Sequence, residues 1–185
     1  MGIKKVYLIS LSVFPLMVCS GIIYSILSLY MAALGASKSQ IGLLYTSGAA
    51  SAAVTSPMMG RLADKVGKRP ILLGSMVIFA LVFIGYALSD NFTDLYPVMM
   101  AEGVGWGGMG AVTVALIADI VPERRRGTAM GIYNTAWNVG WIVGPTMGGV
   151  LSDHLGFRPT FLLCVLIIVT GIILGLLFLP KGLKG

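Results

Sequence analysis

One acidic residue stands alone in a long apolar stretch of the sequence. Glu102 lies among Met99, Met100, Val104 and Trp106, and no Lys or Arg is at helical spacing to neutralise it. If this stretch crosses a membrane, an unpaired carboxyl group there is costly and therefore points to function. Our preferred interpretation is a proton-accepting carboxylate that faces a water-filled cavity. The alternative is a neutral Glu that is hydrogen-bonded between helices and holds a bundle together.

A second group of candidates consists of aromatic and amide side chains within apolar runs. Those that we assign to a substrate cavity are Tyr24, Tyr30, Trp106, Asn134, Trp137, Asn138 and Trp141. The last four follow the spacing i, i+3, i+4 and i+7, so they share one face of a helix. If that face borders a cavity, its indoles and amides can contact a substrate; if it packs inside a bundle, they are structural. Both interpretations remain open, and they apply equally to the two tyrosines.

The sequence offers little for catalysis or for a cofactor. His154 is the sole histidine and falls in a loop, while Cys19 and Cys164 fall in apolar runs, so no nucleophile and base form a pair. Residues 103–108 formally match the glycine pattern of dinucleotide-binding proteins, but that pattern requires a preceding strand and a following helix start. Neither is expected here. We therefore expect that the protein is not an enzyme and that it binds no cofactor and no metal.

The composition indicates a membrane protein. The chain is 57% hydrophobic and only 11% charged, with a mean hydropathy of +0.92, whereas soluble domains are about 25% charged. Its net charge of +6 is not a sign of nucleic-acid binding, which needs a basic face with aromatic or polar readers. The cations instead occupy short segments between apolar runs. The topology of a membrane protein explains these cations better than nucleic-acid binding does.

Six apolar runs reach or approach the length of about 20 residues that a helix needs to cross a bilayer. They are residues 6–34, 40–59, 71–88, 95–121, 127–151 and 159–179. The segments between them carry Gly, Pro, Ser, Asp or clustered charges, which end helices. We predict an all-α membrane protein in which residues 1–185 form a single domain of six transmembrane helices.

The basic residues predict how these helices are oriented. Eleven of the 13 Lys and Arg residues fall on one side of the membrane: Lys4, Lys5, Arg61, Lys65, Lys68, Arg69, Arg124, Arg125, Arg126, Lys181 and Lys184. The other side holds Lys38 and Arg158. By the positive-inside rule, both termini are cytoplasmic. This predicts a multi-pass protein, which we expect in a plasma membrane of the prokaryotic type.

Three motifs resemble those of one transporter family. Residues 60–70, Gly-Arg-Leu-Ala-Asp-Lys-Val-Gly-Lys-Arg-Pro, closely resemble the signature loop between the second and third helices of major facilitator superfamily transporters. Residues 118–127 resemble that family's link between helices four and five. Residues 140–149 resemble the fifth-helix pattern Gly-x-x-x-Gly-Pro-x-x-Gly-Gly of its drug and proton antiporters. This signature comprises Gly140, Gly144, Pro145, Gly148 and Gly149. The proline invites a kink and the glycines permit close helix contact, although simple tight packing would use the same residues.

The resemblance covers the whole chain but only the amino-terminal half of the family's twelve-helix architecture. In such transporters the two halves are related by an axis along the membrane normal, and the substrate site lies between them. The resemblance implies a half-size secondary active transporter that exports small, partly apolar compounds, with proton antiport as the coupling that the family suggests. Its partners would be the lipid bilayer, a small-molecule substrate, and a second copy of itself or a complementary six-helix half.

Two alternatives to this half-size transporter stay open. One is a non-transporting membrane bundle with a structural or partner-binding role, and the other is an excised half of a longer transporter. In a parallel homodimer, the resemblance implies that Asp64 of one copy approaches the start of the partner's fifth helix, near Gly127.

The resemblance also implies two functional roles. Residues on the cytoplasmic face would latch one conformation, with Lys68 placed to bridge Asp64 and Asp119. The full latch comprises Gly60, Asp64, Lys65, Gly67, Lys68, Arg69 and Asp119. Antiporters of the family commonly carry Arg-x-x-Gln-Gly in the fourth helix, where this sequence has Met99-Ala-Glu-Gly. Because the usual cation is absent at Met99, Glu102 becomes the candidate for proton coupling.

Overall fold

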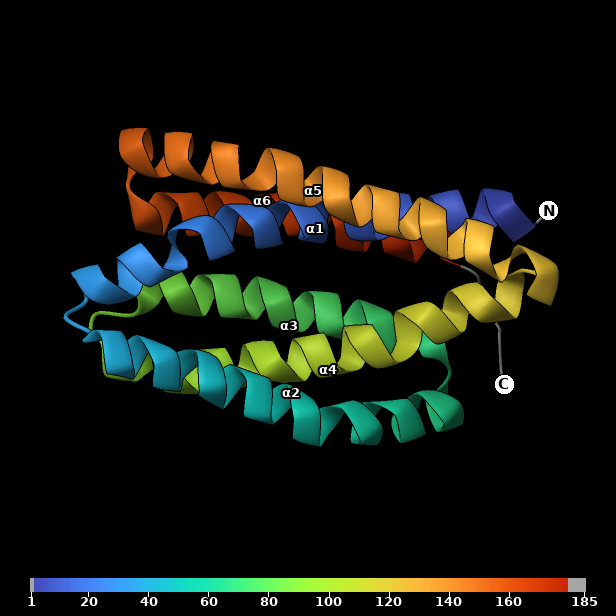
Figure 1. Ribbon diagram of the computed structural model, residues 1–185, viewed down its shortest axis with the longest axis horizontal. Helices are drawn as coiled ribbons and strands as arrows, with labels where there is room; N and C mark the ends of the chain where they lie inside the picture. The colour runs from blue at the N-terminus through green and yellow to red at the C-terminus, as the bar shows by residue number, and fades with distance from the viewer. Residues whose placement is uncertain (1, 180–185) are drawn as a thin grey trace.

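The computed structural model describes residues 2–179, which form six long helices (Figure 1). These are α1 (Gly2–Ala33), α2 (Lys38–Val66), α3 (Lys68–Leu88), α4 (Leu95–Ile120), α5 (Arg126–Leu155) and α6 (Phe157–Phe178). Short 3-10 turns, Phe92–Asp94 and Glu123–Arg125, precede α4 and α5. No strand occurs between residues 2 and 179. The predicted all-α six-helix bundle is confirmed.

The helices pack in two groups of three. Helix α1 packs mainly against α5 and α6, whereas α4 packs mainly against α2 and α3. Contacts between α3 and α6 join the two groups. Successive helices run in opposite directions, so the start of α1, the α2–α3 turn and the α4–α5 link lie at the same end of the bundle (Figure 1).

Helix α2 is longer than the sequence predicted, and its extension absorbs most of the expected loop at residues 60–70. It continues through Val66, and α3 begins at Lys68, so that Gly67 alone connects them. Gly67 has a φ of 96°, which glycine tolerates better than other residues. Its N–H donates to the carbonyl of Ala63 at 2.8 Å. The helix continues because Arg, Leu, Ala and Lys in this segment all favour helix.

The start of α2 is fixed by a capping box. The N–H of Gln40 donates to the Ser37 hydroxyl at 3.4 Å, and the N–H of Ser37 donates to the Gln40 side-chain oxygen at 2.8 Å. This reciprocal pair satisfies backbone donors that the first turn of a helix leaves free. The helix therefore begins at Lys38, two residues before the predicted boundary.

Glycines allow α4 to approach two neighbours closely. Gly103 and Gly107 face α2, where added Cβ atoms would meet the carbonyl oxygen of Gly48 and the hydroxyl of Thr55. Gly105 and Gly108 face α3, where they would meet Phe79 and Ser75. Small residues of this kind are typical where membrane helices pack with their backbones close together.

The helices differ in how apolar and how buried they are. Within the described residues, α1, α3, the segment 92–120 and α6 are both long and apolar enough to cross a membrane. Helices α2 and α5, with 29 and 30 residues, are long enough but contain more Ser, Thr, Gly and Asn. Only three residues of α2 and five of α5 are buried, against 16 of the 32 in α1. Much of the surface of α2 and α5 therefore faces outward.

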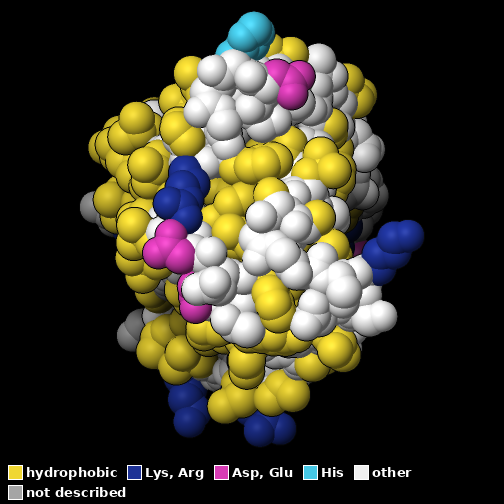
Figure 2. Space-filling view, turned by 90° about the vertical axis from the view of Figure 1, so that its left-hand side faces the viewer, with side chains coloured by type: hydrophobic (Ala, Val, Ile, Leu, Met, Phe, Trp, Pro, Cys, Tyr) yellow, Lys and Arg dark blue, Asp and Glu magenta, His cyan; other side chains and the backbone are white. Residues whose placement is uncertain are grey.

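The described cations gather at one end of the bundle. That end carries Lys4, Lys5, Arg61, Lys65, Lys68, Arg69 and Arg124 to Arg126, while Lys38 and Arg158 belong to the other. Figure 2 shows the second end, where hydrophobic side chains reach the rim and charged ones are few. Lys181 and Lys184, which the sequence assigned to the basic side, lie outside the described residues. The direction of the bundle across a membrane stays a prediction.

Candidate functional site

Glu102 is buried in α4, with 2% of its surface exposed. The hydroxyl of Tyr86, a fully buried residue of α3, donates to its Oε2 at 2.7 Å. Between residues 2 and 179 no Lys or Arg forms an ion pair with this carboxyl group. A hydrogen bond from a phenol on a neighbouring helix thus takes the place of a cation.

The same carboxyl group lies on the wall of a cavity of about 320 Å³ between α1, α2 and α4. The lining residues are Tyr24 from α1, Tyr45, Gly48, Ala49 and Ala52 from α2, and Met99, Glu102, Gly103 and Trp106 from α4. Most of this wall is apolar or aromatic. Among the residues that line it, Glu102 alone has a carboxyl side chain. A few polar groups in an apolar cavity are typical of small-molecule sites.

Aromatic side chains connect this cavity to α5. The indole N–H of Trp106 donates to the Tyr24 hydroxyl at 3.1 Å. The ring centroid of Tyr24 lies 6.4 Å from that of Tyr45 and 6.0 Å from that of Trp141. Trp106 also meets Trp137 edge to face at 5.6 Å. These five residues, which we call the aromatic cluster, come from four helices.

A second cavity, of about 350 Å³, lies on the other side of Trp106 between α4 and α5. It is lined by Trp106, Met109, Gly110, Thr113, Val114, Tyr133, Asn134 and Trp137. Trp106 lines both cavities. The structure thus brings Glu102, Tyr24, Trp106, Asn134, Trp137 and Trp141 into one region.

Two other candidates lie apart from this region. Tyr30 is buried, and its single O–H is shared between the backbone oxygens of Tyr86 and Ser89, at 2.7 and 2.9 Å. Its ring packs edge to face on Phe161, so it fastens α1 to α3 and α6 and is not part of the cavity. Asn138 is exposed on α5 and is absent from the lining of both cavities.

Three tyrosines of the site were not among the predicted residues. Tyr45 lies in an apolar run, and the reasoning that selected Tyr24 would have found it. Tyr133 precedes Trp137 by one helical turn and shares its cavity. Tyr86 had no signal in the sequence, since its contact with Glu102 depends on how α3 and α4 align.

The predicted latch is only partly assembled. Lys68 at the start of α3 forms an ion pair with Asp119 near the end of α4, with 2.5 Å between Nζ and Oδ2. Arg69 donates to the carbonyl of Leu176 on α6. Asp64, however, is exposed and forms no ion pair within residues 2–179. The expected bridge from Lys68 to both carboxylates is therefore absent, because the turn at Gly67 separates α2 from α3.

The remaining residues of the predicted latch are at the end of α2. Gly60 is helical, with open space where a side chain would be, and Lys65 is exposed.

The glycines of the fifth-helix signature mostly face α1. A Cβ atom at Gly144 would lie 2.7 Å from the Cα of Gly21, and those at Gly140 and Gly148 would meet Met17 and Ile22. Gly149 faces open space. Helix α5 continues through Pro145 without interruption. Tight packing against α1 accounts for three of the four glycines.

Comparison with known proteins gives a consistent result. Residues 9–184 match the family described as Major Facilitator Superfamily. The quinolone resistance protein NorA of Staphylococcus aureus is 28% identical over 150 residues, which cover 81% of this chain and 39% of NorA. The multidrug resistance protein fnx1 of Schizosaccharomyces pombe is 32% identical over 105 residues, 57% of this chain and 20% of fnx1.

A third relative comes from an archaeon. An uncharacterized transporter of the same type from Methanocaldococcus jannaschii is 28% identical over 161 residues, which cover 87% of this chain and 42% of that protein. The chain thus spans less than half the length of each of these three relatives.

Proposed function

The chain belongs to the major facilitator superfamily, and from this premise we propose that it forms one half of a secondary transporter that exports small, partly apolar compounds. The names of two relatives, quinolone resistance and multidrug resistance proteins, support export of such compounds. The superfamily model and the apolar helices agree on an integral membrane protein without enzymatic activity.

The observation that carries the proposal is a buried carboxyl group on the wall of an aromatic cavity. Glu102 keeps a hydrogen-bond donor, Tyr86, whether or not it holds a proton, because the phenol can donate to either form. The aromatic cluster offers flat apolar surface to a substrate. A compound that enters the cavity and a proton on Glu102 would then compete for one site, which is the basis of proton antiport.

A second half is needed because α2 and α5 leave much of their surface uncovered. Their exposed faces carry Ser, Thr, Gly and Asn, including Asn134 and Asn138. Amide groups at membrane depth face protein or water, not lipid. We propose that a second copy in parallel orientation covers these faces, with a complementary six-helix half as the other candidate.

Transport of a fluorescent quinolone into liposomes tests the proposal. The purified chain is reconstituted at increasing quinolone concentrations, with a pH gradient imposed across the membrane. We expect saturable flux that follows the gradient, and no such flux in protein-free liposomes. Bound quinolone without flux would instead indicate a bundle that binds the compound but does not transport it. The absence of both binding and flux would contradict the proposed transporter.

A further inference from the structure

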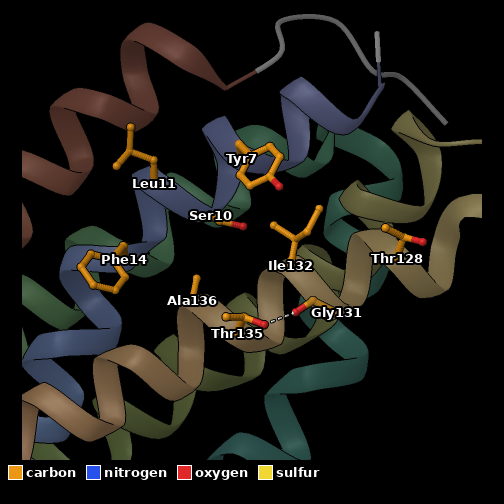
Figure 3. A pocket seen from close by; sticks show the side chains of 9 residues that line it. All are labelled: Tyr7, Ser10, Leu11, Phe14, Thr128, Gly131, Ile132, Thr135 and Ala136. Atoms are coloured by element: carbon orange, nitrogen blue, oxygen red, sulfur yellow. Dashed lines mark hydrogen bonds between the residues drawn. The ribbon is translucent and has the colours of Figure 1, made fainter.

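A cavity larger than either cavity of the candidate transport site lies outside that site. It is a groove of about 720 Å³ between the first half of α1 and the first half of α5 (Figure 3). Its walls are Tyr7, Ser10, Leu11 and Phe14 from α1, and Thr128, Gly131, Ile132, Thr135 and Ala136 from α5. The transport proposal assigns no role to this α1–α5 groove.

The groove faces away from the aromatic cluster. Successive residues of a helix are about 100° apart, so Thr128 in the groove and Trp137 in the second cavity point to opposite sides of α5. The groove is lined by α1 and α5 alone, whereas both cavities of the transport site include α4. It is therefore a separate site on the outside of the α1–α5 pair.

One buried polar side-chain atom in the groove lacks a hydrogen-bond partner. Ser10 is 5% exposed, and its hydroxyl is buried without a hydrogen bond. On the same helix, Ser12 and Ser20 each donate to the carbonyl four residues earlier, as serines in helices commonly do. The Ser10 oxygen instead points into the space between Tyr7 and Ile132 (Figure 3). An occupant with a polar atom at this depth would satisfy it.

Exposed cations lie at the mouth of the groove. Lys4 precedes Tyr7 by three residues and Leu11 by seven, so it shares the face of α1 that lines the groove. On the other wall, Arg124 and Arg125 come one turn before Thr128, and both are exposed. The groove is thus mostly apolar along its length and basic at the end of the bundle where Lys and Arg gather.

The spacing along α1 matches one leaflet of a bilayer. At 1.5 Å per residue, Ser10 lies about 9 Å and Phe14 about 15 Å from Lys4 along the helix axis. The hydrocarbon core is about 30 Å thick, so one leaflet contributes about 15 Å. Tyr7 falls between the cations and the apolar walls, where aromatic residues are enriched at membrane interfaces.

We propose that the α1–α5 groove binds one anionic phospholipid from the leaflet on the basic side. Its phosphate pairs with Lys4 and Arg125, an ester oxygen accepts the hydrogen bond of Ser10, and an acyl chain follows Leu11, Phe14 and Ile132. The polar atom and the apolar length together fit a lipid better than a free phosphate, which would leave the groove unfilled. The inference does not depend on what the transport site carries.

Native mass spectrometry of the full chain tests this proposal directly. Protein stripped of lipid is exposed to dioleoyl phosphatidylglycerol or to dioleoyl phosphatidylcholine, and retained lipid per copy is counted. Near a membrane surface each Lys or Arg contributes about 1 kcal/mol toward an anionic lipid, so two cations favour phosphatidylglycerol by about tenfold or more. We expect one retained phosphatidylglycerol and little phosphatidylcholine.

Matched variants separate the groove from the general lipid-facing surface. Gly131→Leu fills the groove, whereas Gly74→Leu places the same side chain at another exposed helical glycine with open space around it. The first should abolish retention and the second should not. Lys4→Gln with Arg125→Gln should remove the preference for phosphatidylglycerol, while Arg61→Gln with Lys65→Gln, at the same end of the bundle, should leave it intact.

Several results would overturn the lipid site. Equal retention of the two lipids would remove the role of the cations, and equal losses in Gly131→Leu and Gly74→Leu would remove the role of the groove. If Gly131→Leu instead converts a dimer to a monomer without changing lipid retention, the groove is an interface between copies.

Discussion

The carboxyl group of Glu102 meets a phenol on one side and a cavity on the other. The hydrogen bond from Tyr86 ties α4 to α3, as a purely structural Glu would, yet the residue also lines the space between α1, α2 and α4. Its two interpretations are therefore compatible. Substitutions can separate them, because one role requires ionisation and the other requires only a hydrogen bond.

Glu102→Gln should abolish flux driven by a pH gradient while the protein still folds. Glutamine has nearly the same shape and can still accept a hydrogen bond from Tyr86, but it cannot exchange a proton. The measurement is quinolone flux in liposomes with and without the gradient. Glu123→Gln, an exposed acid-to-amide change in the 3-10 turn before α5, serves as the control. Unchanged gradient-driven flux in Glu102→Gln would rule out the proton role.

Tyr86→Phe and Tyr30→Phe should differ in their effect on transport. Each removes a buried hydroxyl and leaves an acceptor unsatisfied, so each should lower the free energy of unfolding by about 1–3 kcal/mol. Of these two tyrosines, Tyr86 donates to Glu102 and Tyr30 does not, so Tyr86→Phe alone of the pair should alter the pH dependence of flux. Thermal unfolding and pH–flux profiles of both variants provide the test. Identical profiles would reduce Tyr86 to a packing residue.

The sequence indicated Glu102 as a candidate but did not indicate its partner. An acid without a cation in an apolar run is visible in the sequence, and polar or aromatic side chains in such runs likewise made Tyr24, Trp106 and Trp137 candidates. The pairing of Tyr86 with Glu102 crosses the link between α3 and α4, so it depends on helix rotation and register. Tyr30 was misplaced for a related reason, since its position in an apolar run does not reveal which side of α1 faces α3.

At the scale of the helices, glycines determine how closely α1 and α5 approach. Gly144 and Gly21 touch at their backbones, and neither position has room for a side chain. Gly149, one turn further along α5, has open space around it. The repeated glycines were evident in the sequence, whereas the identity of the helix that they contact was not.

Gly144→Ala should destabilise the bundle, whereas Gly149→Ala should not. The added methyl group at position 144 would lie 2.7 Å from Gly21, which forces α1 and α5 apart. Overpacking of this kind typically lowers the free energy of unfolding by about 1–3 kcal/mol. Thermal unfolding in detergent provides the comparison. Equal stability of the two variants would mean that the α1–α5 contact is looser than described.

Asp119→Asn should lower the free energy of unfolding of one copy of the chain more than Asp64→Asn does. Asp119 pairs with Lys68, whose side chain is only 13% exposed, so its loss leaves a partly buried cation and should lower the free energy of unfolding by about 1–3 kcal/mol. Asp64 is exposed, and we expect a change within about 0.5 kcal/mol there. Spin-label distances across the end of the bundle that carries Lys68 and Asp119 then test the latch. If neither variant shifts the balance of conformations, these residues only mark topology.

At the scale of the whole molecule, the helices are unevenly buried, which supports the proposed second half. Helices α1, α3, α4 and α6 are apolar and can face lipid or one another, while α2 and α5 combine low burial with polar surfaces. The membrane character of the chain and its number of helices were predictable, because hydropathy depends on residue types alone. The greater exposure of α2 and α5 relative to the other helices was not predictable, because all six runs appeared long enough to cross a bilayer.

The arrangement of two copies is the central proposal, and it places Asp64 of one copy near Gly127 of the other. Both positions are exposed at the same end of the bundle, and a Cβ atom at Gly127 would meet nothing within 4 Å. The start of α5 carries about half a positive charge from its unpaired N–H groups, which favours an approaching carboxylate. The shared bias of basic residues lets both copies insert in the same direction.

Crosslinking between two differently tagged copies in native membranes tests this proposal most directly. One copy carries Asp64→Cys and the other Gly127→Cys, with the buried Cys19 and Cys164 replaced in both, so any crosslink joins separate chains. Gly74→Cys replaces Gly127→Cys in the control. We predict crosslinked dimers for the Asp64 and Gly127 pair and none for the control. Absence of that crosslink in membranes where the protein transports would contradict the parallel dimer.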